Sequence, residues 1–316
     1  MRLAAAVVFL VVPLYVAAAD YPERNIVAVV PFAAGSSNDV IARRVSPPLA
    51  KALGQQVIVE NRPGADGRIG IEVMAKAAPD GHTILFSGGA VALIPALRKN
   101  VPWDPARNIQ PVAELGTIPY VIAVNPNVPA QNVNTFIKLA VAQPGKLNGS
   151  AGGNSSELAI ALFRIKTDTR MEIIPYRGTG YAALAVATGE ADFAIMDASA
   201  WLPFMQSKKV RALAVMGAKR IAAMPDVPTM REAGWTNHDS GAQFGIFTTG
   251  GTPMSAVRRL NAEINRIVAT PEVTKNFIAI GMEPGGMSAE DFTRRYRADL
   301  AMWKDVVARA KIPMTD

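Results

Sequence analysis

An apolar run, Ile26-Val27-Ala28-Val29-Val30-Pro31-Phe32, breaks into the small polar loop Ala33-Ala34-Gly35-Ser36-Ser37-Asn38-Asp39 and then into Val40-Ile41-Ala42-Arg43-Arg44. This order is typical of a strand, a tight loop and the first turns of a helix. Such a junction directs unpaired backbone N–H groups and the positive end of a helix dipole at one point, which favours an anion. Glycine and serine also allow a ligand to approach the backbone closely.

A second junction of the same kind lies in the other half of the chain. The run Leu147-Asn148-Gly149-Ser150-Ala151-Gly152-Gly153-Asn154-Ser155-Ser156-Glu157 leads into Leu158-Ala159-Ile160-Ala161-Leu162-Phe163. One such junction has an ordinary structural explanation, because glycine and serine form turns and helix caps in most α/β proteins. The pair predicts a carboxylate or another anion that is held from both sides.

The N-terminal residues have the pattern of an export signal. Arg2 is a short basic region, residues 3–16 are mostly apolar, and Ala17-Ala18-Ala19 fits a cleavage site of small residues. The alternative, a membrane anchor, is disfavoured because the run is short for a spanning helix and no basic cluster follows it. We therefore expect a signal peptide at residues 1–19 and a periplasmic protein.

Composition narrows the function further. The 316 residues include no cysteine, which excludes disulfides, thiolate metal sites and cysteine nucleophiles. Half of the residues are hydrophobic, which suffices for a sizeable core without disulfides. The formal net charge is +7, but the basic pairs are scattered and are not interleaved with aromatic residues, so nucleic acid is not an expected partner.

Strand-like and helix-like runs alternate along the chain, which predicts mainly parallel sheets covered by helices. The proline pair Pro47-Pro48 falls inside the first helix, where we expect a break or a kink. The expected strands are 26–32, 57–60, 83–86, 120–124, 172–175, 193–196 and 212–215, and the expected helices include 133–142, 156–164, 180–188, 252–268 and 292–310.

Motifs of known catalytic sites are absent from the sequence. It contains no Gly-x-Ser-x-Gly elbow, no His-Glu-x-x-His helix and no phosphate-binding loop of the P-loop type. The two histidines, His82 and His238, lie in polar turns, so we expect them at the surface rather than in a metal site. The sequence therefore favours a binding protein that closes two lobes around a ligand.

Several blocks follow one another in the order of a known family. They are 31–35 with Asp39 and Ala42-Arg43, 59–65 with Gly67 and Ile69-Gly70, 78–85, 175–178, 189–193, Met196-Asp197, 211–215 and 225–229. On these blocks the chain resembles the Bug (TctC-like) solute receptors of tripartite tricarboxylate transporters. Glu60-Asn61-Arg62-Pro63-Gly64 and block 225–229 are the most distinctive, and the resemblance covers essentially the whole mature chain.

The resemblance implies an α/β, two-lobed periplasmic-binding-protein (Venus flytrap) fold. Each lobe is expected to be a mainly parallel sheet flanked by helices, and crossing strands join the lobes. Residues 20–120 with 248–316 would form lobe 1, and residues 121–247 would form lobe 2.

The function implied is capture of a small carboxylate (a dicarboxylate, an amino acid or an aromatic acid) for the membrane permease subunits of a tripartite tricarboxylate-type transporter. The protein is expected to be a monomer without a cofactor. A ligand-sensing receptor for a membrane signalling partner is an alternative with the same fold. An exported hydrolase that uses an unrecognised serine is a third reading.

The resemblance also implies the ligand-binding residues. The loop after the first strand and the facing loop of the second lobe hold the ligand carboxylate, and two further segments complete the walls. The residues implied are Phe32, Ala33, Gly35, Ser36, Ser37, Asn38, Asp39, Ser87, Gly88, Ser150, Ala151, Gly152, Asn154, Ser155, Ser156, Tyr176, Arg177, Gly178 and Asp197.

Three charged residues of this set have particular expectations. Asp39 is expected to cap its helix rather than touch an anion, because like charges repel. Arg177 forms either a fork to a second ligand carboxylate or a structural ion pair. Asp197 either binds a ligand amino group or caps the next helix.

The chain also departs from the family pattern near the expected cleft. Gly35-Ser36-Ser37-Asn38-Asp39 stands where members commonly carry a loop of the type Gly-Gly-Gly-Thr-Asp, so added side chains narrow the space. Asp66 and Arg68 replace small or neutral residues at the expected rim. The identity of the ligand is therefore left open by the sequence.

Overall fold

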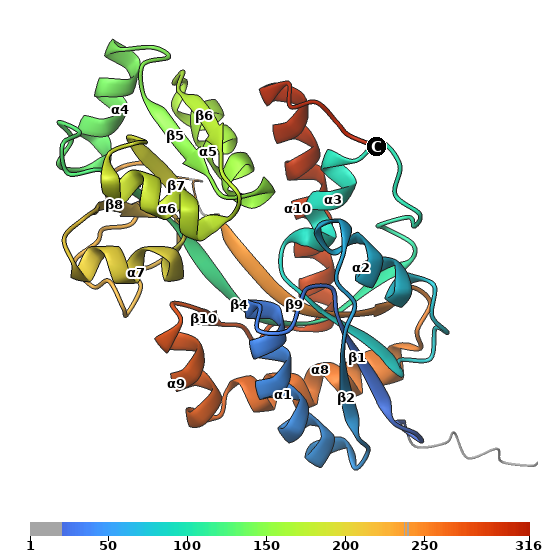
Figure 1. Ribbon diagram of the computed structural model, residues 1–316. Helices are drawn as coiled ribbons and strands as arrows, with labels where there is room; N and C mark the ends of the chain where they lie inside the picture. The colour runs from blue at the N-terminus through green and yellow to red at the C-terminus, as the bar shows by residue number, and fades with distance from the viewer. Residues whose placement is uncertain (1–20, 237, 239) are drawn as a thin grey trace, which may run out of the picture.

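The computed structural model describes residues 21–236, 238 and 240–316 (Figure 1). The expected signal peptide at 1–19 lies outside the described residues. Within the described ranges, no helix combines the length and the apolar character that a membrane span requires.

The strands of the described residues form one sheet in the order β2-β1-β3-β9-β4-β7-β5-β6, and β8 and β10 also pair with β4. The strands β1, β2 and β3 are parallel to one another, as are β5, β6 and β7, whereas β9 runs antiparallel to both β3 and β4. Their bounds are β1 Ile26–Val30, β2 Val57–Asn61, β3 Thr83–Ser87, β4 Ile109–Val124, β5 Asn148–Ala151, β6 Glu172–Pro175, β7 Phe193–Asp197, β8 Arg211–Val215, β9 Gly241–Thr249 and β10 Glu283–Pro284.

Helices cover this sheet, and a short 3₁₀ turn at Ala65–Gly67 precedes the second of them. Their bounds are α1 Ser37–Leu53, α2 Arg68–Ala75, α3 Ala90–Leu97, α4 Val133–Ala142, α5 Asn154–Thr167, α6 Thr179–Thr188, α7 Ala198–Gln206, α8 Met254–Val268, α9 Pro271–Ala279 and α10 Ala289–Ala310.

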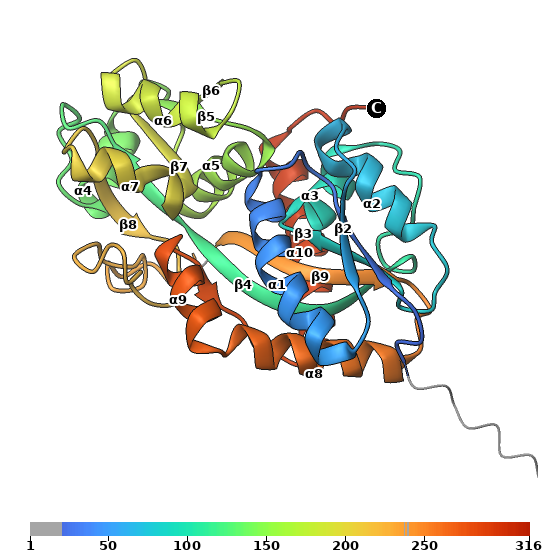
Figure 2. The same cartoon turned by 60° about the horizontal axis from the view of Figure 1, so that its bottom comes forward.

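Two lobes share the long strand β4. Residues 109–119 of β4 pair with β9, whereas residues 120–124 pair with β7 and β8. In Figure 1 the elements β5–β8 and α4–α7 form the upper left lobe, and β1–β3 with α1, α2, α3, α8 and α10 form the other. Figure 2 shows β4 running from one lobe to the other above α8. The lobe boundaries at 120/121 and 247/248 stay a prediction, and β9 spans the second of them as one unbroken strand.

The first junction folds for simple physical reasons. β1 is flanked by β2 and β3 and covered by helices, so Ile26 and Ala28–Val30 are almost fully buried and the strand reads as a continuous apolar run. Helix α1 begins after Ser36, whose hydroxyl accepts a hydrogen bond from the N–H of Asp39, and ends at Gly54, which has a φ of +72°.

The break expected at Pro47-Pro48 does not occur. Helix α1 continues through both prolines. Proline removes the hydrogen bond to the carbonyl four residues earlier, here those of Arg43 and Arg44. Both arginines are exposed, so water can solvate these carbonyls. The opposite face buries Ile41, Val45 and Leu49, and this packing holds the helix together.

The expectation of two surface histidines is also wrong. His82 is 4% exposed and packs edge-on against Tyr21, with ring centroids 5.1 Å apart. His238 is 5% exposed and lies 5.5 Å from the ring of Trp235. A polar turn in the sequence does not reveal that neighbouring aromatic residues cover it. Among the described residues, no group of histidines and acids is arranged to hold a metal ion.

Candidate functional site

A cavity of about 280 Å³ lies between the lobes. From lobe 1 it is lined by Phe32, in the loop after β1, and by Asn38, in the first turn of α1. From lobe 2 it is lined by Gly153, in the loop after β5, and by Asn154 and Ser155, the first residues of α5. Both loops lead into helices, α1 and α5, at the cavity. The two sequence junctions, more than a hundred residues apart, therefore meet at one cavity.

The buried carboxylate of Asp39 organises the lobe 1 loop. Its Oδ2 accepts a hydrogen bond of 2.9 Å from the backbone N–H of Gly35, and its Oδ1 accepts one of 2.9 Å from Nδ2 of Asn61. The Nε of Arg43, one turn further along α1, lies 3.0 Å from both oxygens. Burial alone raises the pKa of Asp39, but the hydrogen bonds from Gly35, Arg43 and Asn61 outweigh it, so this pKa lies below its ordinary value.

These contacts agree with the expectation that Asp39 holds the start of the helix. The N-cap residue itself is Ser36, and Asp39 acts from the first turn of α1. Two backbone donors of that turn remain available, because the N–H groups of Ser37 and Asn38 donate to no acceptor within the described residues. The side-chain oxygen of Asn38 is buried there without a hydrogen-bond partner in the described structure.

A neutral hydroxyl organises the lobe 2 loop. Oγ of Ser156 accepts a hydrogen bond of 2.8 Å from the N–H of Gly152 and donates one of 3.0 Å to the carbonyl of Gly153. The N–H groups of Gly153, Asn154 and Ser155 donate to no acceptor in the described part of the chain. Each wall therefore presents unpaired backbone donors at the positive end of a helix.

Gly152 allows the lobe 2 loop to lie directly on the neighbouring helix. A Cβ at this position would lie 2.4 Å from Cα and 2.5 Å from N of Thr179, at the beginning of α6. Those atoms belong to the backbone, so they cannot move aside as a flexible side chain would. The glycine is required for this close approach.

Tyr120 and Asp197 form the floor beside the lobe 2 loop. They are opposite each other in the pairing of β4 and β7, and a side-chain hydrogen bond joins Tyr120 to Ser155. Burial raises the pKa of Asp197 to about 7, and its Oδ1 has no hydrogen-bond partner among the described residues. Asp197 precedes α7 but makes no side-chain cap, so the capping alternative is not what the structure has.

An apolar surface lies between the two polar walls. Phe32, Leu93, Ile94 and Phe244 line the cavity, together with Tyr120. Phe32 and Gly88 were predicted site residues, whereas Leu93, Ile94 and Phe244 were not, because α3 and β9 were not predicted. Asp66 also lines the cavity, and it lies 3.4 Å from Arg98 in an ion pair.

Other predicted residues lie around the cavity rather than on its lining. The hydroxyl of Ser150 is fully buried and donates to the carbonyl of Ala182, and that of Ser87 is buried without a partner among the described residues. Tyr176 donates to Glu190, and Arg177 is exposed and forms no ion pair with a described residue. The remaining predicted residues off the lining are Ala33, Gly35, Ser36, Ser37, Asp39, Ala151, Gly152, Ser156, Gly178 and Asp197.

The family of this chain follows from its sequence. Residues 41–312 match the family model described as tripartite tricarboxylate transporter family receptor, TctC. The chain belongs to this family. The resemblance predicted from the sequence blocks is therefore confirmed, and the TctC family is one of solute-binding receptors rather than enzymes.

Relatives of similar length support this membership. A protein of Pseudomonas sp. (strain P51), described as a UPF0065 protein in the tcbD-tcbE intergenic region, is 34% identical over 295 residues, which cover 92% of this chain and 88% of the relative. Protein BugT of Bordetella pertussis is 33% identical over 297 residues, which cover 92% of this chain and 91% of BugT.

Solved TctC-like structures share the fold. A TctC solute-binding protein from Polaromonas, solved without ligand, matches with a TM-score of 0.81 at 28% identity, over 92% of this chain and 99% of that one. An R. palustris protein solved with adipate matches with a TM-score of 0.77 at 29% identity, over 93% and 99%. MatC from Rhodopseudomonas palustris, solved with malate, matches with a TM-score of 0.73 at 29% identity, over 91% and 100%. The predicted two-lobed α/β fold is confirmed.

Proposed function

We propose that this chain is a periplasmic receptor that captures a small dicarboxylate between its lobes. It then presents the ligand to the membrane permease of a tripartite tricarboxylate-type transporter. Export depends on the signal at residues 1–19, and the ligand is enclosed when lobe 1 (20–120 and 248–316) closes on lobe 2 (121–247).

The observation that carries this proposal is the pair of donor sets on opposite walls of one cavity. Asn38 presents an unpaired N–H group from the lobe 1 lining, next to that of Ser37, which lies off the lining, and Gly153, Asn154 and Ser155 present theirs from lobe 2. A carboxylate accepts several such hydrogen bonds at once, and a charged acceptor makes each of them stronger. Because the donors belong to both lobes, an anion bound by both sets stabilises the closed form.

The apolar residues between the walls favour a ligand with two charged ends. Phe32, Leu93 and Phe244 can pack on a short aliphatic chain, while each end meets one set of donors. A cavity of about 280 Å³ is small, which favours an acid of a few carbons. Two structural relatives were solved with ligands of this class, adipate and malate.

A thermal-shift series tests the proposal. The mature chain is heated with increasing concentrations of adipate, malate, succinate, aspartate and benzoate, and a ligand that binds only the folded state raises the Tm with concentration. We expect the largest rise with a dicarboxylate. Ser37→Pro and Asn154→Pro each remove one backbone donor at the first residue of a helix, where proline is tolerated.

The matched controls are Ser37→Ala and Asn154→Ala, which remove the side chain and keep the N–H. We expect both proline variants to fold with a nearly normal Tm and to lose most of the ligand-induced rise, whereas the alanine variants keep it. If the folded proline variants respond like the alanine variants, the backbone donors do not hold the anion.

A further inference from the structure

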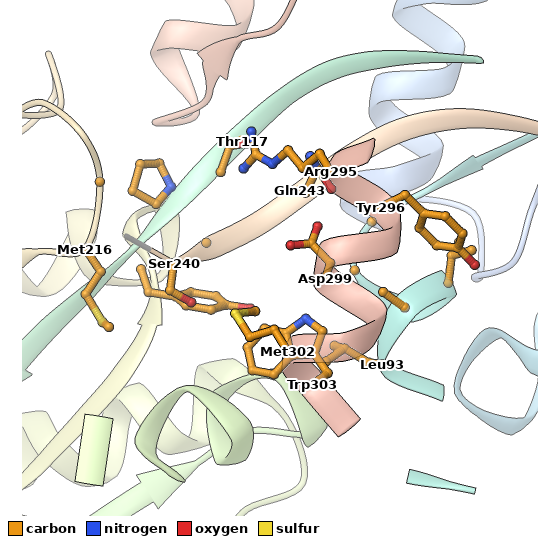
Figure 3. Close-up of a pocket in the computed structure, with 18 of the residues that line it drawn as sticks. Leu93, Thr117, Met216, Ser240, Gln243, Arg295, Tyr296, Asp299, Met302 and Trp303 are labelled. Atoms are coloured by element: carbon orange, nitrogen blue, oxygen red, sulfur yellow. The ribbon is translucent and has the colours of Figure 1, made fainter. Parts of the chain in front are cut away.

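A second cavity, of about 390 Å³, lies behind the strands that cross between the lobes. Strands β4 and β9 contribute Thr117 and Gln243, and α10 contributes Arg295, Asp299, Met302 and Trp303. Met216 and Ser240 line it from the segments that adjoin lobe 2. Figure 3 shows these side chains around one open space, with the carboxylate of Asp299 directed into it from α10.

This cavity is distinct from the interlobe cavity described above. Neighbouring side chains of a strand point to opposite faces of its sheet. Along β9, Ala242 and Phe244 line the interlobe cavity, whereas Gly241 and Gln243 line the second one. The crossing strands therefore separate the two, although Tyr120 and a few residues at the start of α3 border both.

Acidic side chains face the second cavity. Arg295 is already balanced, because its Nη1 lies 3.0 Å from Oε1 of the buried Glu114, which also accepts a hydrogen bond of 3.1 Å from Gln243. Two further acids, Glu283 and Asp299, line the cavity. The carboxylate of Asp299 accepts no hydrogen bond from any residue that the structure describes.

Aromatic and sulfur-containing side chains surround this carboxylate. Trp303 and Met302 are the next residues of the same helix to line the cavity, and Met216 lies across from them. Tyr120 also lines the cavity. Such surfaces bind the apolar body of a ligand, and aromatic rings also attract a cation.

We propose that this second cavity is a binding site for an organic monocation, a protonated amine on an apolar body. The ammonium group pairs with the carboxylate of Asp299, and the apolar body packs against Trp303 and Met302. This site lies on the other face of the crossing strands from the carboxylate site, with which it shares Gly88, Gly89, Leu93 and Tyr120.

The protonation state of Asp299 is compatible with this role. Burial raises its pKa to about 6, with Arg295 opposing the rise and Glu114 adding to it. The carboxylate is therefore mostly ionised at pH 7.5.

Benzylammonium is a suitable probe, because Trp303 reports on it directly. The mature chain is titrated at pH 7.5 by calorimetry and by tryptophan fluorescence, with benzyl alcohol and benzoate as neutral and anionic analogues. We expect saturable binding of benzylammonium, at least tenfold weaker binding of benzyl alcohol, and a fluorescence change that is lost in Trp303→Phe. Benzoate shows whether an anion is excluded from the quenching of Trp303.

Asp299→Asn is expected to weaken benzylammonium binding at least tenfold. Asp305→Asn is the matched control: it makes the same change on the same helix, but Asp305 is exposed, pairs with Arg309 and lies outside the cavity. Circular dichroism and the Tm show that both variants are folded.

Three results overturn the proposal: no saturable binding to the wild type, equal binding by Asp299→Asn and Asp305→Asn, or benzyl alcohol binding as tight as that of the amine. Loss of amine binding in Asp197→Asn but not in Asp299→Asn would place the amine near the interlobe cavity and also contradict it. Because the probe is a cation without a carboxylate, failure here leaves the carboxylate titrations of the proposed function unaffected.

Discussion

Each wall of the interlobe cavity contains the beginning of a helix and has an acidic residue nearby. The pKa values of these two acids are shifted in opposite directions. On lobe 1, Asp39 stays ionised because Gly35, Arg43 and Asn61 all donate to it. On lobe 2, Asp197 lacks such donors on Oδ1, and burial raises its pKa to about 7. An acid beside an anion site is thus tolerated either when its charge is balanced by donors or when a proton neutralises it.

The side chains that fix the two loops also differ in charge. A charged side chain, Asp39, fixes the lobe 1 loop, and a neutral hydroxyl, Ser156, fixes the lobe 2 loop. The lobe 1 loop should therefore depend on pH, whereas the lobe 2 loop should depend on close packing at Gly152.

The largest effect is expected from Gly152→Ala, which breaks the lobe 2 wall. The new Cβ would lie 2.4 Å from Cα of Thr179, so the loop must move. We expect a loss of about 3 kcal/mol in the free energy of unfolding, measured in urea, and loss of carboxylate binding. Gly180→Ala is the control, because a Cβ there meets no atom within 4 Å. Equal behaviour of the two variants would show that the contact with α6 is not required.

Asp39→Ala breaks the lobe 1 wall and is expected to lower the free energy of unfolding by about 2 kcal/mol at pH 7. The pKa of Asp39 is lowered in the folded protein, so its stabilisation is present above the unfolded pKa and is lost as pH falls through the folded one. Urea unfolding of wild type and variant should therefore converge at low pH. A difference in the free energy of unfolding that stays constant between pH 7 and pH 3 would show that Asp39 does not fix the loop through its charge.

Asp197→Asn sharpens the comparison, because its pH dependence has the opposite sign. The pKa is raised to about 7, so the stabilisation by this carboxyl is complete below its unfolded pKa and is lost as pH rises through 7. Asparagine carries no charge, so the variant should have the larger free energy of unfolding at pH 8. Below pH 4 the two should coincide. A wild type that is the more stable protein at pH 8 would exclude a neutralised acid at this position.

Ser156→Ala has the smallest expected effect. It removes the hydrogen bonds to Gly152 and Gly153 but leaves the glycine packing intact, so we expect a loss of about 1 kcal/mol. The loss should not change between pH 5 and pH 8, since a hydroxyl does not titrate there. Urea unfolding at both pH values measures it, and a clear pH dependence would link Ser156 to a titrating neighbour such as Asp197.

The sequence was sufficient to predict the parts of the cavity that depend on neighbouring residues. The junctions at 26–44 and 147–163 each carry a strand, a small loop and a helix within a few residues, and both fold accordingly. The first strand is apolar, and the second consists of small residues and an asparagine. The role of Asp39 at the start of α1 was also predictable, because an acid in the first turn of a helix meets unpaired N–H groups.

The remaining walls depend on contacts between distant residues. The strand at 109–124 was predicted only over 120–124. Proline and glycine argue against a strand interior, yet register shifts in the pairing with β9 occur next to Pro111 and Gly116. β9 itself pairs with β4, more than a hundred residues earlier, so no local pattern marks it. Phe244 was missed because β9 was not predicted, and Leu93 was missed because α3 was not predicted.

The contact between α5 and α10 has a mechanical consequence. Leu158 and Leu162 of α5 share one apolar cluster with Trp303 and Val307 of α10, although the helices belong to different lobes. Dispersion and burial have no preferred direction, so this apolar contact restricts the relative orientation of the two helices less than directional hydrogen bonds would. The two lobes can therefore change their relative orientation at this contact while α5 and α10 stay packed against each other.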